Sequence, residues 1–169
     1  MCIRDRSYAQ SYGLPVAIAR CGNVYGGGDL NWSRIVPGTI RAILEKTTPV
    51  IRSDGTFVRD YLHVDDVVDA YLALASWLDS AGASSERSAP AFNFSDESPR
   101  TVLEMYDAIC EAIGTRIDPE ILGKGGDEIH DQFLDAHRAH DEFGWKTNVG
   151  LHDGLQRTVE WYKQLLAPR

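Results

Sequence analysis

A short apolar run that opens into a glycine-rich polar loop does most to limit the folds available to this chain. Residues 16–19 (VAIA) form the run, and a helix-like segment ended by Gly13 and Pro15 precedes it. A helix, a tight Gly-Leu-Pro link and then an apolar run are typical of an α/β protein. The loop places Asn23 at the carboxyl end of the predicted strand, where open α/β sheets hold their ligands. The stretch therefore predicts an α/β fold with a ligand pocket at this strand end.

The rest of the chain alternates between helical and extended patterns. Apolar residues at helical spacing predict helices over residues 33–46, 64–78, 101–113, 136–143 and 151–166. Short extended runs occupy residues 49–52, 91–94, 119–122 and 132–134, and a small polar tract over residues 80–90 indicates a surface loop. Thr101 and Glu104 have the spacing of a capping box, and His63 is expected to cap or pack at the start of the second helix. The predicted buried face of that helix comprises Val64, Val67, Val68, Tyr71, Leu74, Ala75 and Leu78.

The composition is that of an ordinary soluble globular domain, since 43% of the 169 residues are hydrophobic and 25% are charged. A formal net charge of −8 and the lack of a basic stripe argue against nucleic acid and against an anionic membrane surface as partners. Cys2, Cys21 and Cys110 form no Cys-x-x-Cys pair, which argues against a disulfide framework or zinc site and fits a reducing cytoplasm. No apolar run reaches the roughly 18 residues that a membrane span needs.

The first six residues, MCIRDR, do not continue into the pattern that follows them. They lack the apolar region of a signal peptide, and we expect them to be a leader foreign to the domain. The helix tail that begins near Ser7 predicts a chain that starts in the middle of a domain.

Two features could bind an anion. The triplet Gly26-Gly27-Gly28 is either a phosphate cradle or a plain turn after a strand, and the missing Gly-Lys-Ser/Thr ending of a P-loop favours the turn. Arg59 either pairs with the adjacent Asp60 or grips a diphosphate with its planar guanidinium. The residues alone therefore predict an α/β fragment with a pocket for a nucleotide or phosphate ligand.

Neither a metal site nor a nucleophile is predicted. His137, His140 and Asp141 lie within about one helical turn, but on a helix rich in charge this pattern is more typical of a solvated face. Cys21 has no neighbouring base in the sequence, which argues against a nucleophilic role. His130 follows an acidic loop and is a candidate contact to a ligand phosphate.

Two motifs resemble the extended short-chain dehydrogenase/reductase family, which includes the NAD-dependent epimerases and dehydratases of nucleotide sugars. They are Arg20-Cys-Gly-Asn-Val-Tyr-Gly and Ser53-Asp-Gly-Thr-Phe-Val-Arg-Asp-Tyr-Leu-His-Val-Asp-Asp. The ending, with Phe143-Gly-Trp and Thr158-Val-Glu-Trp-Tyr, is similar to the final helices of the family. The resemblance implies that residues 7–169 form the C-terminal part of an extended Rossmann fold. This part would hold the last parallel strands, interleaved with the small substrate-binding α/β region.

Within the family, GGGDLNWSRIVPGTIR and PVIRSDGTFVRDY are most similar to the CDP-glucose 4,6-dehydratases, because most other members have Gly-Pro where this chain has Gly26 to Asp29. The resemblance implies a NAD-dependent lyase that converts CDP-glucose to CDP-4-dehydro-6-deoxyglucose for polysaccharide deoxysugars, with an intact parent that is a homodimer. Two alternatives stay open: a UDP- or dTDP-sugar epimerase or dehydratase of the same family, and a non-catalytic nucleotide-sugar-binding module.

The family motifs also imply roles for individual residues. The implied substrate contacts are Asn23, Asn31, Arg34, Arg59 and His130, and the implied cofactor contacts are Cys21 and Gly22, beside the nicotinamide of NAD. Asn23 would hydrogen-bond the sugar, Arg59 would hold the diphosphate, and His130 takes the place of a phosphate contact that is often an arginine.

The catalytic groups of the family are not in the sequence. No Tyr-x-x-x-Lys occurs, and neither does the glycine-rich NAD fingerprint. We expect both upstream of Ser7, and we expect the chain alone to be inactive.

Overall fold

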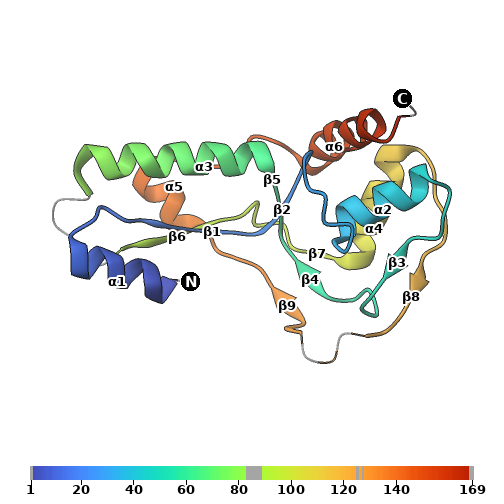
Figure 1. Ribbon diagram of the computed structural model, residues 1–169, viewed down its shortest axis with the longest axis horizontal. Coiled ribbons are helices and arrows are strands. Elements are labelled where there is room, and N and C mark those ends of the chain that lie inside the picture. Colours follow the sequence, from blue (N-terminus) through green and yellow to red (C-terminus); the bar gives the residue numbers. More distant parts are fainter. Residues whose placement is uncertain (1, 83–88, 125, 127, 168–169) are drawn as a thin grey trace.

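The helices and strands gather at two ends of an elongated molecule, with short strands between them (Figure 1). The computed structural model describes residues 2–82, 89–124, 126 and 128–167. One end holds α1 (Cys2–Tyr12), the parallel strands β1 (Ile18–Cys21) and β6 (Ala91–Phe94), α3 (Val64–Trp77) with its π-helical extension η1 (Leu78–Gly82), and α5 (His137–Phe143). The other end holds α2 (Ile35–Leu44), α4 (Val102–Ile113) and α6 (Leu151–Leu165), with β3 (Val50–Ile51) parallel to β8 (Glu120–Ile121).

Two small sets of strands join these ends. One set pairs β2 (Asn23–Tyr25) in parallel with β5 (Tyr61–His63). In the other, β4 (Val58–Arg59) lies between the antiparallel β7 (Arg100–Thr101) and the parallel β9 (Asp131–Gln132). Because β1 and β6 run in register from Ile18 opposite Ala91 to Cys21 opposite Phe94, both end at the same edge, and β2 begins just beyond it.

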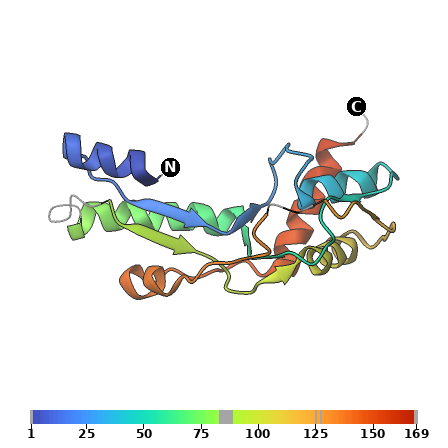
Figure 2. The same cartoon turned by 90° about the horizontal axis from the view of Figure 1, so that it is seen from below.

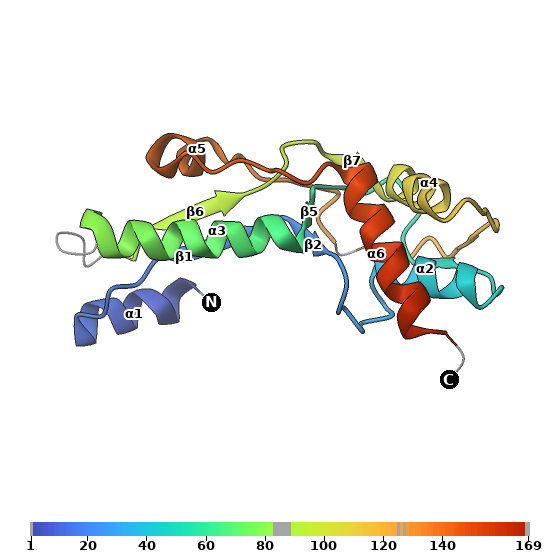
Figure 3. The same cartoon turned by 90° about the horizontal axis from the view of Figure 1, so that it is seen from above.

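The β1–β6 pair lies among helices. α3 runs along the pair, and α1 and α5 lie on opposite sides of it in the views from below and from above (Figures 2 and 3). The main cluster of buried hydrophobic residues at this end comprises Leu62, Val67, Ala70, Leu74, Phe92, Phe94, Ala136, Ala139 and Trp145. Burial of these side chains holds the strand ends in a fixed position relative to α3.

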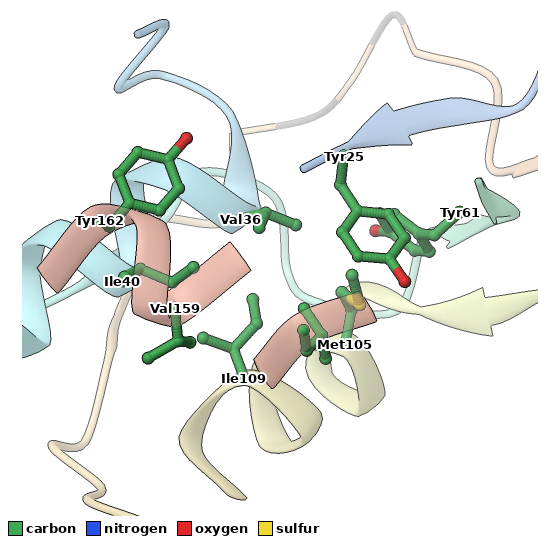
Figure 4. Packing of buried hydrophobic residues seen from close by; sticks show 9 residues of the cluster. Tyr25, Val36, Ile40, Tyr61, Met105, Ile109, Val159 and Tyr162 are labelled. Carbon is green, nitrogen blue, oxygen red and sulfur yellow. The ribbon is translucent and has the colours of Figure 1, made fainter. Parts of the chain in front are cut away.

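A second core fills the other end, where α2, α4 and α6 pack together (Figure 4). Its buried residues are Tyr25, Val36, Ile40, Tyr61, Met105, Ile109, Leu155, Val159 and Tyr162. Tyr25 and Tyr61 come from the joining strands β2 and β5, so this core also fixes the strands that leave the β1–β6 edge.

The structure confirms the five predicted helices, whose ends lie within two residues of the expected positions. It also confirms the capping box: the Thr101 backbone N–H donates to Glu104 at 2.7 Å, and the Glu104 N–H donates to the Thr101 hydroxyl at 3.1 Å. The first strand begins two residues later than expected. Strands β2, β4, β5 and β7, of two or three residues each, were not predicted. Residues 83–88 of the predicted loop lie outside the described part, and α1 includes residues 2–6 of the expected leader.

The predicted buried face of α3 was too wide. Val67 and Leu74 are buried as expected, but Val68 and Tyr71 are 51% and 58% exposed, and Ala75 is exposed too. The physical reason is that the sheet beneath α3 is narrow. Its two strands, β1 and β6, cover only one side of the apolar surface of the helix.

Two general expectations can be compared with the described residues. Cys21 and Cys110 are free thiols there. No helix in the described part of the chain combines the length and the apolar composition that a membrane crossing requires.

Asp66 ties α3 to the segment that leads into α6. Its side chain is 1% exposed, and it accepts the backbone N–H groups of Asn148 at 2.8 Å and Val149 at 3.2 Å. The indole N–H of Trp145 donates to the Asp66 carbonyl at 3.3 Å. Because a buried carboxylate must have partners, this carboxylate and these amides stabilise each other only in the folded chain.

Replacing Asp66 with alanine should lower the free energy of unfolding by about 2–4 kcal/mol, because two backbone N–H groups lose a buried, charged acceptor. Urea unfolding measures this change. Asp69→Ala, which removes an exposed carboxylate from the same helix, is the control and should stay within about 0.5 kcal/mol of the wild type. Equal losses in the two variants would contradict the proposed tie.

His63 makes stability depend on pH. Its Nδ1 accepts the N–H of Asp65 at 3.2 Å and so caps α3, as predicted, and burial lowers the pKa of His63 below its usual 6.5. Below about pH 6.5 the unfolded chain therefore binds a proton that the folded chain resists, and stability falls as pH drops from there toward the lowered pKa.

We expect the melting temperature to fall more steeply between pH 7.5 and 5.5 in the wild type than in His63→Asn, whose amide oxygen can accept the same N–H without titrating. Burial raises the pKa of Asp96, which acts in the opposite direction, but this carboxyl titrates in both proteins. Calorimetric scans at both pH values make the comparison, and parallel losses would rule out His63 as the source.

Candidate functional site

The chain changes strand partners at Gly22. Its N–H donates to the Phe94 carbonyl at 2.9 Å, which ends the β1–β6 pairing, and the next N–H, of Asn23, donates to the Asp60 carbonyl at 2.8 Å. A Cβ atom at position 22 would lie 2.8–2.9 Å from the carboxyl carbon and oxygens of Asp60. Only glycine fits at this position, and its backbone lies directly on a carboxylate that is 3% exposed.

Two hollows meet at Gly22 and Asn23. The first has a volume of about 400 Å³ and is lined by Gly22, Asn23, Val24, Tyr25, Asp29, Arg34, Ile35, Val36, Pro37 and Tyr61. The second, of about 220 Å³, is lined by Arg20, Cys21, Gly22, Asn23, Asp60, Gln132 and Leu134. Both lie at the carboxyl end of β1, which is the edge where parallel sheets hold ligands.

A third hollow continues from the first. It has a volume of about 570 Å³, shares Arg34 and Ile35 with the first hollow, and extends past Trp32 and Arg52 to Glu128. The three hollows therefore form a path from Cys21 through Asn23 and Arg34 toward Glu128.

The loop before α2 is organised by Asp29. One carboxylate oxygen accepts the Asn31 N–H at 2.9 Å and the other accepts the Arg34 guanidinium at 3.0 Å. The Tyr162 hydroxyl of α6 donates to the Asp29 carbonyl at 2.5 Å. Arg34 is held at the rim of the first hollow, with 61% of its side chain exposed.

The glycine triplet sets the approach of this loop. A Cβ at Gly26 would lie 2.5 Å from a methyl carbon of Val64, and a Cβ at Gly27 would lie 2.6 Å from the Trp161 ring. Gly26 also has a φ of 150°. Gly26 and Gly27 are thus packed against α3 and α6, and Gly28 has a φ of 93°, so the turn accounts for all three glycines without a phosphate.

Arg59 is fixed by contacts other than the predicted pair with Asp60. Its Nη1 donates to the carbonyls of Val58 at 2.7 Å and His130 at 2.8 Å, and its Nη2 lies 3.4 Å from the Glu128 carboxylate. The guanidinium carbon lies 5.5 Å from the centre of the Phe57 ring. The ionic partner is therefore Glu128, 69 residues away, and only 12% of the Arg59 side chain is exposed.

His130 contacts Arg59 through its backbone carbonyl, and the centre of its ring lies 5.2 Å from that of Phe57. Its Nδ1 lies 2.6 Å from Asp131, and its Nε2 lies 3.1 Å from the Thr56 hydroxyl. More than half of its side chain is exposed. Both ring nitrogens already have partners within the chain.

The structure thus divides the predicted site residues into two groups. Gly22, Asn23 and Arg34 line the first hollow, Cys21 lines the second with Gly22 and Asn23, and Asn31 lies on the exposed turn beside Arg34. Arg59 and His130 form a separate pair near the far end of the third hollow, through Glu128.

Tyr61 and Glu128 belong to this region but are not among the residues predicted from the sequence. Tyr61 could have been found, because it follows Arg59 and Asp60 in a motif already singled out. Glu128 gives no local signal, because its partner is so distant in the sequence.

The phenol and thiol groups that line the first two hollows keep their protons at neutral pH. Burial raises the pKa of Tyr61 to about 12 and that of Tyr25 still higher. Burial, assisted by the Asp60 carboxylate, also raises the pKa of the Cys21 thiol. Because they stay protonated, these groups are not suited to removing a proton from a ligand.

The histidines of α5 do not gather as the sequence spacing suggested. His140 lies 3.3 Å from Asp141, whereas His137 lies close to Glu97 and Asp135. All three members of the latter group are exposed, and a Glu97 oxygen accepts the Ala136 N–H at 3.1 Å. These three side chains are therefore solvent-exposed groups beside the start of α5.

Comparison with known proteins gives the relatives of this chain. The profile of the NAD dependent epimerase/dehydratase family matches residues 5–86. CDP-glucose 4,6-dehydratase of Salmonella typhimurium is 30% identical over 91% of this chain and 43% of its own length. UDP-glucose 4-epimerase of Mycolicibacterium smegmatis is also 30% identical, over 92% of this chain and 48% of its own length. The chain therefore spans less than half the length of these relatives.

Solved structures agree with the fold. UDP-glucose 4-epimerase of Thermotoga maritima, in a structure with UDP-glucose, matches 98% of this chain and 52% of its own with a TM-score of 0.85 at 28% identity. dTDP-glucose 4,6-dehydratase of Bacillus anthracis, in complex with NAD, matches 96% of this chain and 49% of its own with a TM-score of 0.79 at 26% identity. The predicted α/β fold of the Rossmann type is confirmed, and the chain belongs to the NAD-dependent epimerase/dehydratase family of extended short-chain dehydrogenases/reductases.

Proposed function

We propose that this chain forms the nucleotide-sugar-binding part of a NAD-dependent 4,6-dehydratase, and that its substrate is CDP-glucose. The observation that carries the proposal is the path of hollows that starts at Gly22 and Asn23 and continues past Arg34 toward Glu128 and Arg59. A small neutral group fits at the strand end, and cationic side chains lie farther along, which is the order of groups in a sugar joined to a nucleoside diphosphate.

The chain's own residues bind and orient this substrate. Asn23, exposed at the junction of the hollows, hydrogen-bonds a sugar hydroxyl, and Tyr61, its partner across β2 and β5, lines the same hollow. Arg34 and Asn31, held by Asp29, contact the phosphates or the cytosine. Arg59 holds the diphosphate, since a guanidinium suits its paired oxygens, and His130 lies next to it.

The second hollow suits part of a cofactor. Cys21 and Gly22 line it, its volume of about 220 Å³ admits one aromatic ring but not a dinucleotide, and the Cys21 thiol stays protonated. We propose that the nicotinamide ring of NAD lies there, while other residues of the intact protein hold the rest. NAD supplies the oxidation at C4 of the glucose and the return of hydride to C6 after water is lost across C5 and C6.

The choice among nucleotide sugars rests on residues 26–34. Overall identity does not separate them, because relatives named for CDP-, UDP- and dTDP-sugars are each 30% identical. The turn over Gly26 to Asp29 is packed against α3 and α6, and it presents Asn31 and Arg34 in a way that we propose is selective for cytidine. A non-catalytic binding module is the second candidate, because the sequence contains no Tyr-x-x-x-Lys. We further propose a cytoplasmic homodimer for the intact protein.

Isothermal titration of this chain with CDP-glucose, UDP-glucose and dTDP-glucose tests the binding proposal. We expect saturable binding that is tightest for CDP-glucose. Tighter binding of UDP-glucose or dTDP-glucose would mean that this nucleotide sugar, and not CDP-glucose, is the substrate. Turnover is tested on a protein that joins this chain to the family's glycine-rich and Tyr-x-x-x-Lys segments. There, CDP-glucose with NAD should give a 4-keto product that absorbs in alkali, whereas binding without any product would favour the non-catalytic module.

Arg59→Ala should weaken CDP-glucose binding by about 1.5–3 kcal/mol, roughly 10- to 150-fold, because a charge-assisted contact to the diphosphate is lost. Titration calorimetry measures the change, and circular dichroism checks that the variant is folded. Arg157→Ala removes an exposed arginine of α6 that pairs with Asp65, and it should bind as the wild type does. Unchanged affinity in Arg59→Ala would mean that this arginine serves only the packing of β4.

A further inference from the structure

The guanidinium of Arg59 is held rigidly on one side only. Its Nη1 carries two hydrogens, and both are used, by the Val58 carbonyl at 2.7 Å and the His130 carbonyl at 2.8 Å. The His130 carbonyl also accepts the Val58 N–H at 2.9 Å, so the contact is part of the β4–β9 pairing. With the Phe57 ring beneath it, the guanidinium plane has a fixed direction.

The other side of the guanidinium faces an exchangeable partner. Nη2 meets the Glu128 carboxylate at 3.4 Å, a long contact for an ion pair. The two side chains differ sharply in exposure, at 12% for Arg59 and 69% for Glu128. An arginine that is fixed and desolvated thus offers one edge to a carboxylate that is free to move into water, and a pair of this kind is weak.

Glu128 also lies where the proposed ligand would arrive. It lines the hollow of about 570 Å³ that begins at Arg34 and passes Arg52, so an anion that enters along this hollow meets Glu128 before it meets Arg59.

We propose that Glu128 is a resident counter-ion that occupies the phosphate position on Arg59 and is displaced when a diphosphate binds. This inference rests on the proposed function, because it takes Arg59 as the diphosphate contact. Glu128 neutralises the charge of the desolvated arginine in the free protein, and a neutral or weakly charged ligand does not displace it from Arg59. A diphosphate does displace it, because its oxygens form paired, charge-assisted contacts with the same edge of the guanidinium.

Glu128→Gln tests the exchange, because glutamine keeps the size of the side chain and removes the charge. We expect this variant to bind both inorganic diphosphate and CDP-glucose about two- to fivefold more tightly than the wild type, the scale of a weak ion pair. Glu142→Gln is the matched control: it makes the same charge change in an Arg–Glu pair of α5, where Arg138 and Glu142 are 2.9 Å apart, and should leave binding unchanged.

The increase in affinity caused by Glu128→Gln must depend on Arg59. Comparing Arg59→Ala with the double variant Arg59→Ala/Glu128→Gln by calorimetry should show no further gain from the second change. A gain that persists without Arg59 would overturn the proposal in favour of general repulsion, and equal or weaker binding by Glu128→Gln alone would overturn it as well. Thermal melts of each variant exclude unfolding as the cause.

The two ligands separate this inference from the proposed function. If CDP-glucose binds and Glu128→Gln changes nothing, the counter-ion role is wrong and the proposed function stands. If inorganic diphosphate shows the Arg59-dependent gain but CDP-glucose does not bind, the exchange stands and the nucleotide-sugar assignment is wrong. If neither ligand binds to any variant, both are wrong.

Discussion

The arrangement of the whole molecule depends on the contact between the backbone of Gly22 and the buried carboxylate of Asp60. At this point β1 leaves β6 and the chain continues as β2 beside β5, so one residue separates two strand pairings. The contact leaves no room for a side chain at position 22. Because the two cores lie on either side of this crossing, the hollows form between them, at the free ends of the strands.

The same crossing brings together segments that are distant in the sequence. Asp60 receives the Leu134 N–H at 3.2 Å through its carboxylate and the Asn23 N–H through its carbonyl. The strand end, the β4–β5 corner and the segment before α5 therefore share one buried acid. Asn23 can serve as a ligand contact because its backbone position is set by this acid rather than by a flexible loop.

The helices and the position of Asn23 beyond a strand end could be predicted from the sequence, because their signals are local. The Thr101 capping box, the helical spacing of Leu155 and Val159, and a polar Asn23 after an apolar run each act within a few residues. The partner of Arg59 could not be predicted, since Glu128 is brought near it only by the β4–β9 pairing. The predicted width of the buried face of α3 was wrong for a related reason: periodicity shows which residues are apolar, but tertiary packing decides which of them are covered.

The glycine turn over residues 26–28 has a consequence for motion. Its close approach to Val64 and Trp161 fixes the start of the loop that carries Asn31 and Arg34 against α3 and α6. The hydroxyl of Tyr162 adds a bond from α6 to Asp29. The loop and the last helix therefore belong to one cooperative unit of opening, and the backbone amides of both should exchange with solvent at a common rate. The stability of this loop is thus expected to depend on a helix that follows it by more than a hundred residues.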